Sequence, residues 1–296
     1  MSEQAIDAWA RQQLAEVERA LEQLVPASAP AGLGQAMRYG VLDGGKRLRP
    51  LLVLAACQAV RGQQSAAMRA AVAVELIHAY SLIHDDMPCM DNDVLRRGKP
   101  TVHVQFGQAQ AMLAGDAMQA LAFEVLTPGH DMEPALQARL CSLLARSAGH
   151  AGMAGGQAID LASIGQPLSE DALRDMHRRK TGALLQASVL MGAACGEVTP
   201  DTWSALSDYG AAIGLAFQVV DDILDVTQDS EVLGKTAGKD RDNNKPTYVS
   251  VLGLAQARAH AMQLCGHAHA ALTRSGLGEH AGMLKALADK VVERDK

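Results

Sequence analysis

The chain reads IHDDMPCMD over residues 83–91, where an apolar, helix-patterned segment ends in a group of carboxylates. A second group of this kind ends the run FQVVDDILD at residues 217–225. The preceding pairs, Leu82-Ile83 and Val219-Val220, have the character of buried helix residues, and acids at the end of a core helix need partners or metal ions. Carboxylates at a helix C-terminus also oppose the macrodipole. One D-D-x-x-D run alone would as readily cap a helix or face water, but two such placements favour a functional site.

The composition indicates an all-α protein. Ala, Leu, Gln, Glu, Met and Arg recur throughout, aromatic residues make up only 3%, and β-branched runs with period-two alternation are scarce. The chain of 296 residues has no linker-like or repetitive stretch, which favours one domain over residues 1–296. Helices are expected at about 6–24, 50–61, 66–84, 104–126, 134–149, 152–164, 170–192, 201–226, 246–273 and 279–294, with a further short segment that ends at 42. Residues 87–101 and 227–245 are expected to form loops.

The charge balance excludes a broad nucleic-acid surface, because 33 acidic residues outnumber 27 basic ones and the net charge is −6. The five cysteines are scattered without a C-x-x-C pair, which is typical of reduced thiols in a core. No signal-peptide pattern opens the sequence, and the longest apolar run, at residues 51–57, is far shorter than the roughly 20 residues that span a bilayer. We therefore expect a soluble, cytoplasmic protein. His267 and His269 point to different sides of a helix and are expected to be ordinary surface residues.

The spacing of the acids favours magnesium. Asp221 and Asp225 are four residues apart, so on a helix they lie about 40° from each other and about 6 Å apart along the axis. Asp85 and Asp91 are six apart, and Pro88 between them implies that the backbone leaves the helix and folds back toward Asp85. Hard oxygen ligands of this type suit Mg²⁺, which often also binds substrate phosphates. The clusters therefore predict a metal-dependent enzyme that acts on a diphosphate.

Basic residues lie where they could bind that anion. The run GGKRLRP at residues 44–50 places flexible glycines beside three cations just before a helix start, where free N–H groups attract phosphate. It lacks the spacing of a Walker loop, so nucleotide binding is not implied. RRGK at 96–99 follows the first acidic cluster, and Lys235, Lys239 and Lys245 follow the second.

Together these residues resemble the trans-isoprenyl diphosphate synthase family, and within it the bacterial farnesyl diphosphate synthases. The resemblance spans nearly the whole chain and rests on GGKRLRP at 44–50, HAYSLIHDD at 78–86, DNDVLRRGKPT at 91–101, GDA at 115–117, GGQ at 155–157 with Asp160, KTG at 180–182 and FQVVDDILD at 217–225. It implies an all-α fold, a large bundle of mostly antiparallel helices around a deep central cavity, and usually a homodimer.

The resemblance also implies roles for single residues. The Mg²⁺ ligands would be Asp85, Asp86, Asp91, Asp221 and Asp225. Isopentenyl diphosphate would be bound by Gly45, Lys46, Arg49, His78 and Arg97. The allylic diphosphate would be bound by Arg96, Lys180, Lys235 and Lys245, while Thr181 and Gln218 would face the carbocation. The departures are slight, since Cys89 and Asn92 stand where the closest pattern tends to have Ala and Asp.

The implied reaction is a condensation of isopentenyl diphosphate with dimethylallyl and then geranyl diphosphate. Three Mg²⁺ ions, which Mn²⁺ could replace, would draw negative charge onto the departing diphosphate together with the Lys and Arg side chains. Tyr80, five residues before Asp85, would act as a floor that limits the product to C15. The small Ser81, one turn below Asp85, would leave room for a ten-carbon allylic substrate.

Other functions stay open at this point. Geranylgeranyl diphosphate synthesis is the nearest alternative, because Tyr80 could pack elsewhere. His84-Asp85 is also typical of metal-dependent phosphohydrolases, although those need further ligands upstream. A terpene cyclase would share the metal-triggered ionisation, but Lys46 and Arg49 favour chain extension. A non-catalytic subunit would be expected to lack acids from one cluster, and here both clusters are intact.

Overall fold

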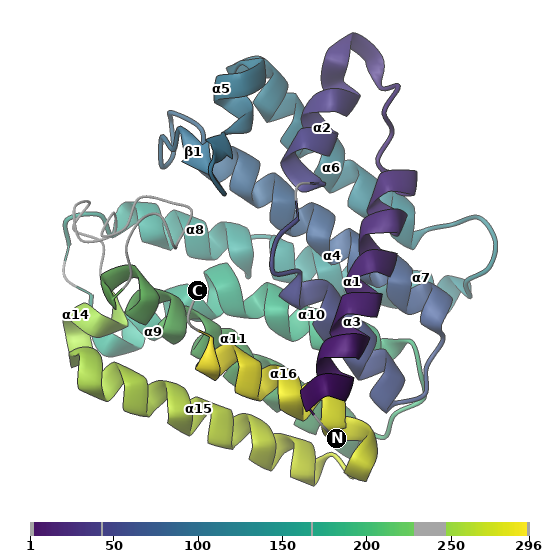
Figure 1. Ribbon diagram of the computed structural model, residues 1–296, viewed down its shortest axis with the longest axis vertical. Coiled ribbons are helices and arrows are strands. Elements are labelled where there is room, and N and C mark those ends of the chain that lie inside the picture. Colours follow the sequence, from purple (N-terminus) through teal and green to yellow (C-terminus); the bar gives the residue numbers. More distant parts are fainter. Residues whose placement is uncertain (1–2, 43, 167, 228–246, 295–296) are drawn as a thin grey trace.

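The computed structural model describes residues 3–42, 44–166, 168–227 and 247–294 as helices joined by short connections (Figure 1). The first half contains α1 (Glu3–Leu24), η1 (Pro30–Gly32), α2 (Leu33–Val41), α3 (Leu48–Ala59), α4 (Gln64–Asp85), β1 (Leu95–Arg96), β2 (Lys99–Pro100), α5 (Val102–Phe106), α6 (Gln108–Leu126) and α7 (Pro134–Ala148). The second half contains α8 (Met153–Ala162), α9 (Glu170–His177), η2 (Arg178–Gly182), α10 (Ala183–Ala194), α11 (Pro200–Thr227), α14 (Tyr248–Leu252), α15 (Leu254–Arg274), η3 (Gly278–Ala281) and α16 (Gly282–Glu293). The all-α prediction is confirmed.

The centre of the fold is formed by helices that are apolar around most of their circumference. In α3, Leu54 faces the core cluster around α4, whereas Leu52 faces the cluster around α11 and α15. In α10, Met191 and Val189 divide between the same two clusters. Helices buried on every side have no polar face to present to water. The sequences of α3 and α10 therefore place them between the two halves of the core, and they also pack against each other.

The outer helices pack on either side of this centre (Figure 1). On one side α6 packs against α4, and on the other α15 packs against α11. By length and composition α4 is, among the described residues, the one helix apolar enough to cross a membrane, but 67% of its apolar window is buried inside the fold. That burial is what a core helix shows. The single-domain interpretation stays a prediction.

Two helices predicted as continuous are each broken by a glycine. The expected helix at 104–126 is divided into α5 and α6 at Gly107, which has a φ of +87°. The expected helix at 246–273 is divided into α14 and α15 at Gly253, with a φ of +80°. A glycine adopts this left-handed region without the steric cost that a Cβ would bring. The predicted continuity was wrong, because helix-forming residues continue on both sides of each glycine and hide the break.

The third correction is a π-helical turn. The expected helix at 170–192 contains η2, in which the backbone widens for five residues before α10 resumes the α-helical path. Turns of this kind recur at functional sites, because the extra residue re-aims the side chains that follow it. Here the widened turn contains Lys180 and Thr181, two of the predicted site residues.

Candidate active site

The first acidic cluster is assembled by a loop that reverses the chain. Asp85 is the last residue of α4, and the backbone N–H of Asp91 donates to the carbonyl of Asp85 at 2.8 Å. The N–H of Asp93 donates in the same way to the carbonyl of Asp86 at 3.1 Å. These two hydrogen bonds return Asp91 to the helix end, as Pro88 had indicated.

The loop leads into a short hairpin that positions Arg96. Strands β1 and β2 pair Leu95 with Pro100 and Arg96 with Lys99, and Arg97 and Gly98 between them have φ values of +54° and +74°. Two consecutive residues at positive φ suit a tight two-residue hairpin turn. From this hairpin Arg96 donates two hydrogen bonds to the buried Asp86 carboxylate, with Nε at 2.9 Å from Oδ2 and Nη2 at 2.5 Å from Oδ1.

Burial and crowding control the charge of these acids. Burial raises the pKa of Asp85 to about 6, with Lys180 acting to lower it and Asp91 acting to raise it further. Burial also raises the pKa of Asp86, which the Arg96 hydrogen bonds oppose. A carboxylate that is costly to ionise gains most from a bound cation. The donors here are hard oxygens, so this cluster fits Mg²⁺.

A group of cationic side chains lies beside this cluster. Burial lowers the pKa of His78 well below its ordinary value, and four guanidinium groups lower it further, those of Arg49, Arg97, Arg96 and Arg47. Burial lowers the pKa of Arg49 to about 10, which the charges of Glu75 and Asp221 partly offset. The buried Nε of Arg49 has no hydrogen-bond partner within the described part of the chain. A group of cations with an unused donor is suited to a polyanionic ligand.

The glycine segment ahead of α3 contacts this group of cations. Arg97 donates through Nη1 to the carbonyl of Gly44. A Cβ on Gly45, whose φ is +134°, would lie 2.7 Å from Nη2 of Arg97. The glycine therefore permits the hairpin arginine to lie against the segment that carries Lys46. The structure thus brings Gly45, Arg49, His78 and Arg97 together as predicted, with Lys46 next to them in the chain.

Arg47, in the same segment, is occupied by the fold. It is buried and bonds Glu18 at 2.7 Å and Glu75 at 2.6 Å, and it also donates to the carbonyl of Val41 at 2.5 Å. These contacts join α1 and α4 to the segment between α2 and α3. Sequence reasoning grouped Arg47 with the cations of this motif, whereas the structure uses it to position its neighbours.

The second acidic cluster follows one face of α11. Asp225 is buried, while Asp221 is 3.5 Å from Nη2 of Arg294 at the end of α16. Asp222 points into the protein, where it accepts hydrogen bonds from Nε2 of Gln218 and from the backbone N–H of Tyr248, both at 2.8 Å. The structure therefore gives Asp222 a structural role, while the assignment of Asp221 and Asp225 to the site stays a prediction.

The π-helical turn places two further predicted residues beside the clusters. Lys180 donates to Asp160 on α8 at 2.5 Å, and its charge acts on Asp85. A Cβ on Gly156 would lie 2.2 Å from the backbone nitrogen of Lys180, so only glycine lets α8 come this close. Thr181 donates to Oε1 of Gln218 at 3.0 Å. Gln218 thereby links the π-helical turn to α11.

Electrostatic contacts connect the two clusters. Arg49 responds to the charge of Asp221 from the second cluster, and it also acts on His78, which responds to Arg96 from the first. The site therefore combines carboxylates from two distant segments with cations between them. Lys235 and Lys245, also predicted to bind here, lie outside the residues that the structure describes.

Tyr80 lies below Asp85 between α4 and α6. Its hydroxyl accepts a hydrogen bond from Nε2 of Gln119 at 3.5 Å, and its ring meets that of His84 edge-on at 5.7 Å. Burial raises the pKa of Tyr80, and the charge of Asp85 adds to the effect. Ser81 is half-buried and donates to the carbonyl of His78 at 2.8 Å. The charge of Asp85 thus reaches the Tyr80 hydroxyl, and the role of Tyr80 as a floor stays a prediction.

Two residues near the site were not among its predicted members. Asp160 had been noted beside the GGQ motif, but only its contact with Lys180 reveals that it positions that cation. Arg294 lies over the ring of Phe217 at 3.9 Å and donates to its carbonyl at 2.6 Å. No local pattern at the C-terminal end indicates that contact, because it depends on how α16 packs on α11.

Comparison with known proteins identifies the group to which this fold and site belong. The family described as polyprenyl synthetase matches residues 30–274. The chain belongs to the polyprenyl synthetase family. The farnesyl diphosphate synthase of Escherichia coli is 47% identical over 268 residues, which cover 88% of this chain and 89% of that protein.

Two further proteins of this kind are similar to the chain. The chloroplastic heterodimeric geranylgeranyl pyrophosphate synthase large subunit 1 of Arabidopsis thaliana is 48% identical over 254 residues, or 84% of this chain and 68% of that protein. A Helicobacter pylori geranyltransferase structure, complexed with magnesium and isoprenyl diphosphate, aligns with a TM-score of 0.84 and 34% identity, covering 96% of this chain and 95% of that one. The resemblance seen in the sequence is confirmed at the level of the prenyltransferase family, and the phosphohydrolase alternative gains no support.

Proposed function

We propose that this chain is a farnesyl diphosphate synthase, which condenses isopentenyl diphosphate first with dimethylallyl diphosphate and then with geranyl diphosphate. The observation that carries the proposal is the position of Tyr80 on α4, five residues before Asp85, with its hydroxyl directed to Gln119 of α6. Because both farnesyl and geranylgeranyl synthases are among the relatives, the family alone leaves the product length open.

In this proposal the carboxylates bind the metal ions and the cations bind the substrate diphosphates. Asp85, Asp86 and Asp91 from one segment, with Asp221 and Asp225 from the other, would hold Mg²⁺, in a number we infer to be three. Bound Mg²⁺ supplies Lewis-acid stabilisation of the negative charge on a departing diphosphate. The resemblance divides the cations between the two substrates. Arg96 and Lys180 would orient the allylic diphosphate, whereas Lys46, Arg49, His78 and Arg97 would bind that of isopentenyl diphosphate. His78, whose pKa is strongly lowered, would do so as a neutral hydrogen-bond donor.

The residues around the reacting carbons stabilise positive charge without trapping it. The Gln218 amide oxygen accepts from Thr181, so the dipoles of both groups are held in place before substrate arrives. Preorganised dipoles of this kind stabilise developing charge without reorganisation. The proton lost after carbon–carbon bond formation would pass to the released diphosphate, so the protein needs no acid–base pair of its own.

Product analysis tests the assignment. The purified chain is incubated with isopentenyl and dimethylallyl diphosphates and Mg²⁺, and the dephosphorylated products are sized by chromatography and mass spectrometry. The wild type and Tyr80→Phe, which keeps the ring, are expected to form mainly C15 products, and Tyr80→Ala is expected to form C20 or longer ones. A dominant C20 product from the wild type would overturn the Tyr80 floor while leaving the prenyltransferase activity intact.

Three further features complete the proposal. Activity should disappear on chelation with EDTA and return with Mg²⁺, and Mn²⁺ should substitute for it. We also infer that the chain forms a homodimer and acts in the cytoplasm, without nucleic-acid or membrane partners. Light scattering of the purified protein tests whether it is a homodimer, and cell fractionation tests whether it is cytoplasmic.

A further inference from the structure

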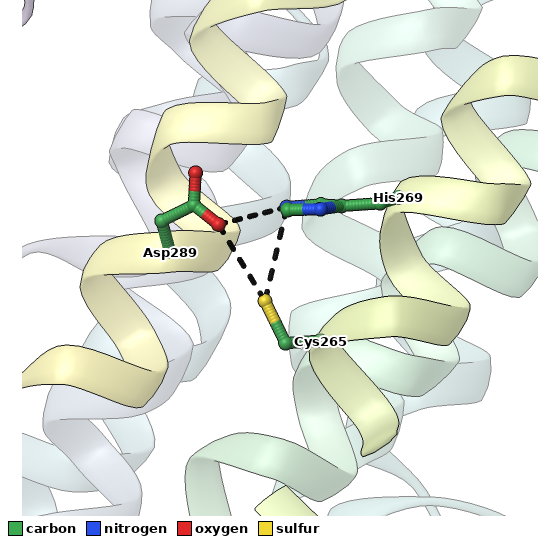
Figure 2. A group of neighbouring side chains, drawn as sticks. All are labelled: Cys265, His269 and Asp289. Atoms are coloured by element: carbon green, nitrogen blue, oxygen red, sulfur yellow. Dashed lines mark hydrogen bonds and ion pairs between the residues drawn. The ribbon is translucent and has the colours of Figure 1, made fainter. Parts of the chain in front are cut away.

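A thiol, an imidazole and a carboxylate converge on the outer side of the helices that follow the second acidic cluster. Cys265 and His269 lie four residues apart on α15, and Asp289 faces them from α16 (Figure 2). Their donor atoms all lie within 4.8 Å of one another. These residues belong neither to the carboxylate clusters nor to the group of cations described above.

The three atoms form a closed triangle. Sγ of Cys265 is 3.7 Å from Nε2 of His269 and 3.6 Å from Oδ1 of Asp289, while Nε2 and Oδ1 are 2.8 Å apart. A nucleophilic triad would place the acid and the thiol on opposite ring nitrogens of the histidine. Here both contact the same nitrogen, so the arrangement is unsuited to relaying a proton.

Hydrogen bonds alone do not account for all three contacts. The thiol and a neutral imidazole protonated on Nε2 can each donate one proton, and both protons would go to Oδ1 of Asp289. No proton would then be left for a hydrogen bond between Cys265 and His269. One cation at the centre of the triangle would serve all three atoms at once.

The dimensions match those of tetrahedral zinc. With Zn–S of about 2.3 Å and Zn–N and Zn–O of about 2.1 Å, tetrahedral geometry places the sulfur about 3.6 Å from each other ligand and the nitrogen about 3.4 Å from the oxygen. Both sulfur distances in the structure lie within about 0.1 Å of this requirement. Only the distance between Nε2 of His269 and Oδ1 of Asp289 must increase, by about 0.6 Å, which small side-chain rotations supply.

The surroundings allow a metal ion to enter and to be retained. The side chains of His269 and Asp289 are 32% and 40% exposed, so the open side of the triangle faces solvent. Cys265 is buried, which protects the soft ligand from competing reactions. Spacing of four along a helix puts two ligands on one face, and the third comes from a second helix, so that an ion would join α15 to α16.

We propose that Cys265, His269 and Asp289 form a structural zinc site, with water as the fourth ligand, that clamps α16 onto α15. On binding, the thiol releases its proton to solvent and ligates as thiolate, His269 ligates through the Nε2 lone pair, and Asp289 through a carboxylate oxygen. Arg294, five residues after Asp289, lies over Phe217 next to the second acidic cluster. The clamp therefore anchors the helix that delivers this arginine.

Cobalt provides the direct test, because a thiolate ligand gives Co²⁺ a charge-transfer band and tetrahedral geometry gives it intense visible bands. The full chain is titrated with Co²⁺ in excess Mg²⁺, which occupies the hard carboxylate sites. We expect both spectral features to saturate at one equivalent per chain and to disappear when Zn²⁺ displaces cobalt. Zn²⁺ should also raise the melting temperature of the wild type.

Matched cysteine variants assign the ligand. Cys265→Ser should lose the charge-transfer band, while Cys89→Ser, which alters an exposed thiol beside the first cluster, should keep it. Asp289→Asn, whose amide can still bond the histidine, should fold and bind cobalt at least roughly tenfold more weakly. This variant keeps the proposal testable if Cys265→Ser does not fold. The proposal would be overturned if the wild type lacks the band, if Cys265→Ser keeps it, or if Asp289→Asn binds cobalt with unchanged affinity. Each of these results would mean that the three side chains are only hydrogen-bonded to one another.

Discussion

The two acidic clusters place similar carboxylates on different scaffolds. In the first, the Asp85 end of α4 and the returning Asp91 are joined by backbone hydrogen bonds across a loop, and Arg96 grips Asp86 from the hairpin. In the second, Asp221 and Asp225 share one face of a continuous helix, and Asp222 is tied into the core. The loop cluster depends on chain reversal, whereas the helical cluster depends on periodicity alone. Substitutions should therefore damage the two in different ways.

The largest effect is expected at the first cluster. Asp85→Ala should lower kcat by about 10³-fold or more, because it removes a carboxylate from the metal-binding group that stabilises the departing anion. Folding should be retained, since the raised pKa of Asp85 shows that its charge is unfavourable where it lies. Steady-state kinetics and circular dichroism measure the two quantities. Asp208→Ala, at an exposed ion pair with Arg274, is the control, and unchanged turnover in Asp85→Ala would exclude the assigned role.

A structural effect is expected at the second cluster. Asp222→Ala removes the acceptor for Gln218 and for the backbone N–H of Tyr248, and leaving buried donors unpaired should cost about 3 kcal/mol of stability. Urea denaturation of the variant and the wild type measures this difference. A loss below about 0.5 kcal/mol would mean that water replaces the carboxylate, and the distinction between site acids and structural acid would fail.

A pH dependence is expected from the histidine behind the second cluster. Burial lowers the pKa of His177 to about 4, with Asp160 and Asp221 acting to raise it and Lys180 to lower it. The unfolded chain, with a pKa near 6.5, binds this proton more readily, so stability falls as pH decreases from about 6.5 toward 4. Between pH 7 and pH 5 the loss due to His177 should be about 2 kcal/mol.

Denaturation at several pH values checks that slope. His177→Asn should remove about 2 kcal/mol of the pH dependence, whatever its effect on stability at pH 7. His267→Asn, at an exposed histidine of α15, should leave the slope unchanged. Equal slopes in the wild type and His177→Asn would show that another group titrates.

The smallest effect is expected at the C-terminal contact. Arg294→Ala removes a cation over the Phe217 ring, a hydrogen bond to the Phe217 carbonyl and a weak ion pair with Asp221, which together should contribute about 1.5 kcal/mol. Thermal unfolding measures the change, and Arg274→Ala, at an exposed pair, should change stability by less. A loss as large as that of Asp222→Ala would mean that α16 depends on Arg294 for docking.

Several site features could be anticipated because they are local. The spacing of Asp221 and Asp225, the glycines beside Lys46 and the proline after Asp86 each have a short-range consequence that the structure shows. Features that arise from packing could not be anticipated from the sequence. The contact of Lys180 with Asp160 requires Gly156 to bring α8 against the π-helical turn, and the occupied state of Arg47 requires acids from α1 and α4. His269, expected to be an ordinary surface residue, is 32% exposed and also paired with Asp289 of another helix, a contact that spacing along one helix could not indicate.

The amino-acid sequence by itself determined the helical class, the position of each carboxylate cluster at a helix end and the resemblance that led to the family. These properties follow from periodicity and from residue type, which act over a few neighbouring positions. The tertiary structure alone decided which charged groups the fold buries and pairs, as it pairs Arg47 with Glu75 and Arg96 with Asp86. That outcome depends on burial and on partners far apart in the chain, because the cost of a charge is set by its surroundings rather than by its sequence neighbours.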